Sequence, residues 1–211
     1  MIFKYSWILC ICISLIMICG CHSQSYAPIP TYIDQDLGAI ATGPDGNVWF
    51  TEPYANEIGK ISPINYTITA YQVPPAYASV YGIALGSDGN LRFIEQSGNK
   101  IGKISPSGNA TVYSIPGNSS THNFSACIIV GPDNDLWFTE SDGNEIGKIS
   151  PINGEVTEYS VPGAEAYLNG IIAGPDGNLW FTISVESGGS GNNIEKISPA
   201  TGVVTEYPVV N

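Results

Sequence analysis

The sequence predicts an all-β protein, a β-propeller of about four four-stranded blades, because one strand-forming pattern returns four times. The segment GPDGNVWFTE (43–52) recurs as GSDGNLRFIE (86–95), GPDNDLWFTE (131–140) and GPDGNLWFTI (174–183), at spacings of 43, 45 and 43 residues. No window shows helical periodicity of useful length. A unit of four strands repeated roughly every 40–45 residues is typical of propeller blades.

Each repeat is expected to run through its four strands in the same order. An apolar stretch such as residues 170–173 leads into a Pro-Asp-Gly turn, where glycine adopts a positive φ without steric cost. The WFTE segment then returns as the second strand, rich in aromatic and β-branched residues. A third strand, EIGKISP at 57–63, and a fourth, EVTEYSVP at 155–162, recur in the same way. Both faces are apolar, which indicates that each sheet packs between two neighbours.

Length and charge narrow the classes of function. The chain of 211 residues is long enough for one core and too short for separate cofactor and substrate domains. Seven Lys and Arg against 19 Asp and Glu give a net charge of −12. That sign argues against nucleic acid and anionic membrane surfaces as partners, because both require positive charge on the protein.

The first 21 residues read as a secretory signal peptide. Lys4 precedes a largely apolar run over residues 7–19, which suits a signal h-region and is too short for a spanning helix. Residues 18–21, Ile-Cys-Gly-Cys, resemble a lipobox that would place a lipid on Cys21. The sequence therefore predicts a lipid-anchored extracytoplasmic protein, touching the membrane only through that lipid. Cleavage and secretion, or retention as an uncleaved anchor, are the alternatives.

The repeat motifs resemble the blades of the virginiamycin B lyase (streptogramin B lyase) family, and more loosely gluconolactonase-type propellers. The resemblance is carried by GPDGN-[VL]-WFTE, IGKISP and VTEY-x-VP, and it covers residues 38–208. Residues 22–37 would be a linker with a candidate closing strand at 28–37, and residues 209–211 a tail. The family closes a ring of seven blades, whereas this chain holds about four. A small closed ring, an open arc completed by a second copy in a homodimer, and a shortened relic remain open.

The resemblance also locates a site. The family places a catalytic histidine before the Gly/Ala-Ile start of a first strand, with a glutamate nearby that helps to hold Mg²⁺. Here the matching positions are Gly38, Tyr81, Ala126 and Asn169, so the family's base is absent. An amide has no useful basicity, and a phenol ordinarily titrates near pH 10. The remaining candidate bases are His122, in a longer loop on the same face, and Tyr81.

Other candidates are the positions where the repeat brings carboxylates together or loses its symmetry. Glu52, Glu95 and Glu140 end three of the four second strands and could converge on a divalent cation; alternatively each bonds backbone or pairs with Lys60, Lys103 or Lys148. Arg92 replaces a tryptophan, so it either contacts a nearby carboxylate or marks a packing gap. Glu186 lies in an inserted Gly/Ser-rich loop. Asn169, Arg92 and Glu186 are the candidate ligand-binding residues.

Two functions remain open from the sequence. One is a noncatalytic propeller that binds a small-molecule or protein ligand at its channel mouth. The other is a Mg²⁺-dependent lyase that opens the cyclic ester of streptogramin B, an antibiotic-resistance activity, with His122 or Tyr81 as an unusual base. The missing histidines and missing blades favour binding over catalysis.

Overall fold

The computed structural model describes residues 37–74, 79–115, 127–140, 143–162, 166–185 and 193–209 of the chain. These belong to one compact unit, Tyr32–Asn211. Within the described residues, 16 strands form four antiparallel four-stranded sheets, which confirms the predicted propeller blades. None of the helical segments that the structure describes is long and apolar enough to cross a membrane. The signal segment with Cys21, and residues 28–36 of the candidate closing strand, lie outside the described residues.

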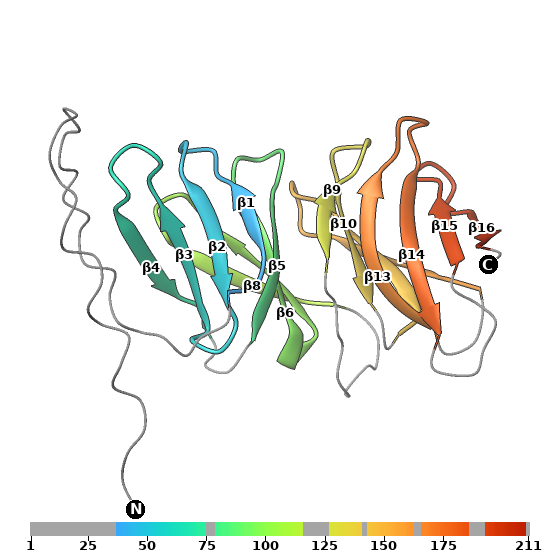
Figure 1. Cartoon of the computed structure of the whole chain (residues 1–211), viewed down its shortest axis with the longest axis horizontal. Helices are drawn as coiled ribbons and strands as arrows, with labels where there is room; N and C mark the ends of the chain where they lie inside the picture. The colour runs from blue at the N-terminus through green and yellow to red at the C-terminus, as the bar shows by residue number, and fades with distance from the viewer. Residues whose placement is uncertain are drawn as a thin grey trace, which may run out of the picture. The chain divides into compact units, whose positions relative to one another are not determined.

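Each sheet is one sequence repeat, and its strands stand side by side in chain order (Figure 1). The first sheet holds β1 (Ile40–Thr42), β2 (Val48–Glu52), β3 (Glu57–Ile61) and β4 (Ile68–Gln72). The second holds β5 (Val80–Leu85), β6 (Leu91–Glu95), β7 (Lys100–Ile104) and β8 (Ala110–Ser114), with a 3₁₀ turn, η1 (Gln96–Gly98), after β6. The third holds β9 (Ile128–Val130), β10 (Leu136–Glu140), β11 (Glu145–Ile149) and β12 (Val156–Ser160). The fourth holds β13 (Ala166–Ala173), β14 (Leu179–Val185), β15 (Asn193–Ile197) and β16 (Val204–Pro208).

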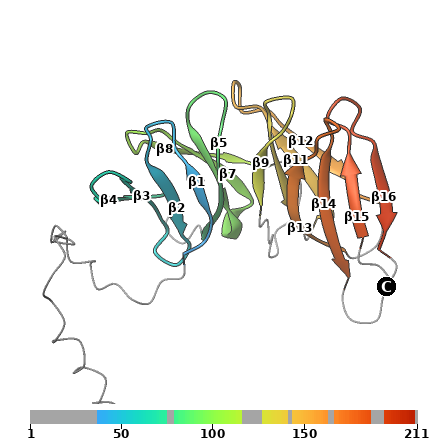
Figure 2. The same ribbon diagram turned by 45° about the horizontal axis from the view of Figure 1, so that its top comes forward.

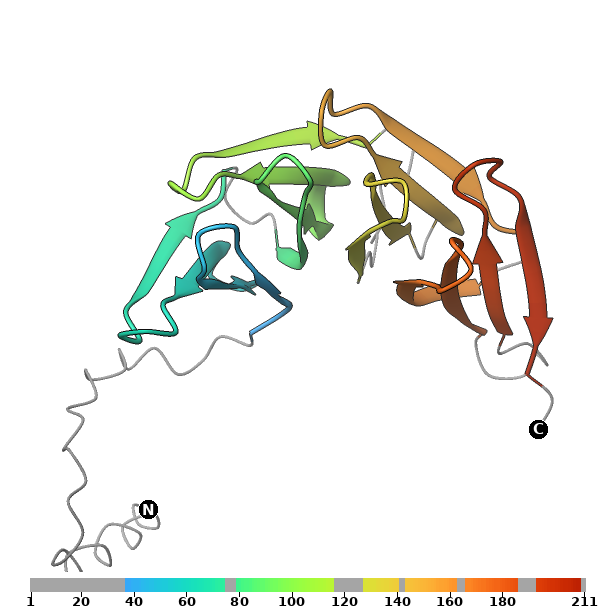
Figure 3. The same cartoon turned by 90° about the horizontal axis from the view of Figure 1, so that it is seen from above.

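The four sheets follow one another along an arc (Figure 3). The first strands lie on the inside, where β1 contacts β5, β5 contacts β9, and β9 contacts β13. The fourth strands lie on the outside, and the oblique view shows the same succession of sheets (Figure 2). The first and fourth sheets stand at the two ends of the arc, so the sheets described here form an open propeller and not a small closed ring.

The core consists of three layers of side chains between neighbouring sheets. Trp49 of β2 packs in one cluster with Leu91 and Phe93 of β6, and Trp137 of β10 packs in another with Leu179 and Phe181 of β14. Each internal sheet therefore offers a tryptophan or arginine face to the sheet that follows and a phenylalanine face to the sheet before. Because successive residues of a strand point to opposite faces, the apolar WF pair supplies both layers at once.

An aspartate in each first turn holds that turn and the following strand together. Asp45 accepts hydrogen bonds from the backbone N–H of Asn47, at 3.2 Å, and from the indole Nε1 of Trp49, at 2.9 Å. Asp133 and Asp176 accept the same indole bond at 3.0 Å. This confirms the turn role expected of these residues.

The lysines that were one alternative partner for the glutamates bind these turn aspartates instead. Lys60 lies 3.1 Å from Asp45, and Lys148 lies 3.3 Å from Asp135 and 3.8 Å from Asp133. The expected pairing of Lys60 and Lys148 with Glu52 and Glu140 is therefore wrong. The lysines occupy the tryptophan face of each sheet, whereas the glutamates occupy the phenylalanine face.

Arg92 takes the place of tryptophan in the second sheet and makes the same connection to the turn. Its guanidinium bonds Asp88, with 3.0 Å between Nη2 and Oδ2, and also donates to the carbonyl of Pro151 in the third sheet at 2.9 Å. Of the two alternatives, a contact with a nearby carboxylate is confirmed. The side chain is 1% exposed. Its position makes it a link between two sheets, and nothing in the geometry supports the predicted role in binding a ligand.

The two end sheets carry apolar side chains that no described residue covers. Ile40, on the Phe50 face of the first sheet, is 71% exposed, and Ile172, on the Trp180 face of the fourth, is 66% exposed. The tryptophans of the first and third sheets are fully buried, whereas Trp180 is only partly buried. At each of the three contacts between neighbouring sheets, the tryptophan or arginine face of one sheet packs against the phenylalanine face of the next. One face of each kind is thus left exposed at the two ends of the arc.

Candidate functional site

Two of the predicted site residues sit at matching irregularities of the innermost strands. The register of β5 against β6 shifts between Val80 and Ile83, and that of β13 against β14 shifts between Leu168 and Ile171. Tyr81 and Asn169 are each the first of two residues that lie opposite a single residue of the neighbouring strand. A β-bulge re-aims a side chain out of the regular alternation and is often found next to active sites. We call the edge of the sheets that carries Gly38, Tyr81 and Asn169 the rim edge.

The side chains at the rim edge are polar and accessible. Asn169 is exposed, and its Nδ2 donates to the Ser184 hydroxyl at 3.0 Å and to the Tyr167 carbonyl at 3.1 Å. Tyr81 is half-buried. Tyr81 belongs to the second sheet and Asn169 to the fourth, and strand β9 of the third sheet lies between their strands β5 and β13. The described ranges contain no histidine. His122, Glu186, Ala126 and Cys21 lie outside those ranges.

The three glutamates predicted to converge do not form one group. Glu52 is half-buried and Glu95 and Glu140 are each 1% exposed, on the faces of Phe50, Phe93 and Phe138. Each side chain therefore enters the space on the phenylalanine side of its own sheet. The alternation of the strands is the reason, because a residue two places after the phenylalanine shares its face. Burial raises the pKa of Glu95 to about 6, against the opposing effect of Lys100.

Glu140 instead meets two acids that sequence reasoning overlooked. Glu145 stands directly opposite it on β11, and Glu158 lies on β12. One oxygen from each of the three carboxylates lies within 4.8 Å of the others. Burial, followed by the charges of Glu158 and Glu145, raises the pKa of Glu140 to about 8. The signal was present in the repeat, because the second sheet has Lys100 and Val112 where the third has Glu145 and Glu158.

A second overlooked carboxylate lies between the third and fourth sheets. Glu195 is 2% exposed and pairs with Phe181 across β15 and β14, at a position where the other three sheets have glycine. Its Oε2 accepts no hydrogen bond. Burial raises the pKa of Glu195 to about 7, and the charge of Glu206 adds to the rise. This departure from the glycine of the EIGKISP motif could have been found by aligning the repeats.

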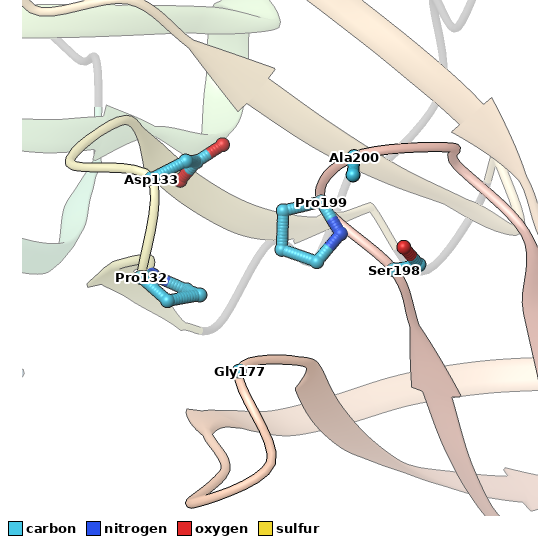
Figure 4. Close-up of a pocket in the computed structure, with 6 residues that line it drawn as sticks. All are labelled: Pro132, Asp133, Gly177, Ser198, Pro199 and Ala200. Carbon is cyan, nitrogen blue, oxygen red and sulfur yellow. The ribbon is translucent and has the colours of Figure 1, made fainter.

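A small pocket lies at the opposite edge of the sheets, where the Asp-containing turns are. It has a volume of about 260 Å³ and lies between the turn with Pro132 and Asp133 and the turns with Gly177 and residues 198–200 (Figure 4). Pockets that enclose a small-molecule ligand usually measure about 300–1,000 Å³. This pocket is smaller, and none of the predicted site residues lines it.

Sequence and structure comparisons decide the family. The family model described as the virginiamycin B lyase family matches residues 23–211, almost the entire chain. The chain belongs to the virginiamycin B lyase family. The comparison with curated proteins found no match.

Several solved structures resemble this member of the virginiamycin B lyase family. A streptogramin B lyase structure is 36% identical with a TM-score of 0.74, covering 87% of this chain and 57% of that chain. Virginiamycin B lyase from Staphylococcus aureus is 36% identical with a TM-score of 0.76, covering 87% and 59%. A catalytically inactive histidine-to-alanine variant of the S. aureus enzyme, with quinupristin, is also 36% identical, with a TM-score of 0.73, covering 86% and 57%. A gluconolactonase from Xanthomonas campestris, at 14% identity and a TM-score of 0.62, shares the fold alone.

The chain spans slightly more than half the length of the virginiamycin B lyase structures that it matches. Exchange of one histidine for alanine inactivates the S. aureus enzyme. The four positions that the sequence matched to the family's histidine are Gly38, Tyr81, Ala126 and Asn169. Family membership therefore fixes the scaffold of this chain.

Glu195 makes the stability of the protein depend on pH. With an ordinary pKa of 4.5 in the unfolded chain and about 7 in the folded one, the folded state keeps its proton longer. The contribution of Glu195 to stability is therefore greatest at low pH and is lost as pH rises through 4.5 towards 7. We expect Glu195→Gln to raise the free energy of unfolding by about 1–3 kcal/mol at pH 8 and by much less at pH 5. Urea denaturation across this pH range measures the difference.

The matched control is Glu155→Gln, which changes an exposed acid in a turn and should leave the pH dependence as it is. Glu206→Gln should act in the same direction as Glu195→Gln but more weakly, since it removes only the second cause of the shift. Parallel pH profiles of the wild type and Glu195→Gln would show that this buried carboxyl does not carry the effect.

Proposed function

We propose that this chain is a binding member of the virginiamycin B lyase family, which takes a small-molecule or protein ligand at the rim edge without using the family's histidine base. The observation that carries the proposal is the pair of β-bulges at Tyr81 and Asn169. They present a phenol and an amide at positions where the family's chemistry calls for a base. Asparagine can donate and accept hydrogen bonds but cannot take up a proton at neutral pH.

The rim edge suits a ligand with both polar and flat apolar parts. The Tyr81 ring offers a surface for stacking and a hydroxyl for a hydrogen bond. The Asn169 amide is held in place by Tyr167 and Ser184 and still has its carbonyl oxygen to offer. Side chains fixed in this way lose little conformational entropy when a ligand binds. His122 and Glu186, outside the described residues, are proposed to contribute from the neighbouring loops.

A second candidate function is Mg²⁺-dependent opening of a cyclic ester, favoured by family membership and by the similarity to streptogramin B lyase. Glu95 fits the metal chemically, because it is an oxygen donor whose two carboxylate oxygens accept no hydrogen bond. Bound Mg²⁺ would stabilise negative charge on the substrate. Tyr81 or His122 would then have to remove the proton next to the carbonyl.

Streptogramin B separates the two functions. We expect the full chain to leave the antibiotic intact with and without Mg²⁺, as followed by mass spectrometry of the ring-opened product, since no histidine occupies the family's position. Calorimetric titration with the same compound tests binding, which Asn169→Ala should weaken about tenfold, the usual effect of one lost hydrogen bond.

A matched control is Asn153→Ala, in a turn at the opposite edge, which should leave binding unchanged. Mg²⁺-dependent turnover that persists in His122→Ala and is lost in Tyr81→Phe would replace the binding function by catalysis with Tyr81 as the base. If the chain neither binds nor converts streptogramin B, this ligand class is excluded.

We further propose that the chain is exported and held at the membrane by a lipid on Cys21, facing away from the cytoplasm. The support is the apolar segment over residues 7–19 followed by the lipobox-like residues 18–21. Secretion without a lipid is the alternative. Cys21→Ala is expected to move the protein from the membrane fraction to the soluble extracytoplasmic fraction. Wild-type protein that is recovered without a lipid-sized mass increase at Cys21 would favour secretion.

A second copy of the chain is the proposed partner for the open end faces. The Trp180 face of the fourth sheet and the Phe50 face of the first are the two halves of the contact made three times inside the arc. Head-to-tail contacts between two copies would bury Ile172 and Ile40.

Light scattering is expected to give twice the mass of the chain. Ile172→Glu should restore the single-chain mass, because a charge cannot be buried in this contact without a partner. Ile152→Glu, on an equally apolar but isolated turn residue that is 89% exposed, should not change it. A single-chain mass for the wild type at all concentrations would contradict self-association.

A further inference from the structure

Three carboxylates gather on one face of the third sheet. Glu140 ends β10, Glu145 begins β11 directly opposite, and Glu158 lies on β12 opposite Gly147. Residues two places apart on a strand share a face, so all three lie on the face of Phe138. One oxygen from each lies within 4.8 Å of the other two. We call these three residues the carboxylate triad.

The surroundings of the carboxylate triad are apolar on the side of the core. The Phe138 ring lies over Gly147, in the space that a larger side chain there would need. Phe138 packs in one cluster with Ile94 and Ile101 of the second sheet. Charges next to such a layer interact more strongly than charges in water, because the local dielectric constant is low.

Glu140 enters this group buried and without a partner. The residue is 1% exposed, and its Oε1 accepts no hydrogen bond. Within the triad and its neighbours, the Ser160 hydroxyl donates to Glu145 Oε1 at 3.4 Å. Burying an ionised carboxylate without compensation costs several kcal/mol, so a carboxyl at this depth with an unpartnered oxygen either holds a proton or binds a cation.

The other sheets show that the fold does not require three acids here. The second sheet places Lys100 opposite Glu95 and has Val112 in the third position, so its buried acid faces a cation. The first sheet has only two acids at these three positions, because Ala70 takes the third. The triad is therefore a property of the third sheet alone among the four.

We propose that the carboxylate triad of Glu140, Glu145 and Glu158 binds one Ca²⁺ ion on the phenylalanine face of the third sheet. The three oxygens lie within 4.8 Å of one another, so small side-chain movements bring all of them to the distance of about 2.3–2.6 Å at which Ca²⁺ binds oxygen. Ca²⁺ suits the triad better than Mg²⁺, because Ca²⁺ accepts irregular sets of carboxylate oxygens whereas Mg²⁺ requires a near-ideal octahedron at about 2.0–2.1 Å. Water completes the coordination, as is usual at sites with few protein ligands.

The ion would act as a clamp on β10, β11 and β12, because each strand supplies one ligand. It would replace the repulsion among three acids by attraction, and so stiffen the part of the sheet that faces the second blade. This role is separate from ligand binding at the rim edge and does not depend on it.

Calorimetric titration and thermal unfolding of the full chain test the proposal, with CaCl₂ and MgCl₂ as the only added ligands. We expect one Ca²⁺ per chain, a dissociation constant of about 1 mM or tighter, as in extracellular Ca²⁺ modules, and a rise in Tm that Mg²⁺ does not match. Glu145→Lys, which installs the residue of the second sheet, should abolish Ca²⁺ binding while raising the Tm measured without metal. Glu158→Val should weaken binding at least tenfold.

Glu57→Gln, at the position of Glu145 in the first sheet, is the matched control and should bind Ca²⁺ as the wild type does. Circular dichroism establishes that each variant has the wild-type strand content. Absence of Ca²⁺ binding in the wild type at about 1 mM would overturn the proposal, and so would binding of equal strength in Glu145→Lys. A response to Mg²⁺ stronger than that to Ca²⁺ would overturn the assignment of the ion.

Discussion

The packing of one sheet against the next is the constraint on which this structure depends. Every internal sheet buries both faces, so its second strand supplies a large side chain to each side, as Trp137 and Phe138 do in the third sheet and Arg92 and Phe93 in the second. This requirement recurs once per repeat and leaves little freedom in the scaffold. Charged residues enter the layers where a partner bonds them, as Asp88 and the Pro151 carbonyl do for Arg92, or at the cost of a shifted pKa, as the buried glutamates do.

The buried acids show what happens when that requirement is not met by an ordinary partner. Glu95 faces Lys100, whereas Glu140 and Glu195 face other carboxylates, and the rise in pKa is larger for these two. The glutamate at this position therefore faces a lysine in the second sheet, whose charge offsets part of the effect of burial, and is left to a proton or the proposed cation in the third.

Family and fold do not by themselves assign an activity. The chain is 36% identical to streptogramin B lyase over the 87% of its length that is matched, and it spans slightly more than half of that structure's length. The register shifts at the rim edge hold Tyr81 and Asn169, two of the positions that the sequence matched to the family's histidine. The ligand binding proposed at that edge and the cation binding proposed on the third sheet involve different residues and can be tested separately.

The sequence by itself determined the strands, the turns and the family, because these depend on local patterns repeated every 43–45 residues. It also located Arg92 and the rim positions as breaks in that pattern. The tertiary structure decided which side chains meet: Glu140 was expected beside Glu52 and Glu95, and lies instead beside Glu145 and Glu158. Repeat equivalence places residues at the same height in different blades, whereas contact depends on strand register and on the face each side chain takes. Only the folded sheets fix both.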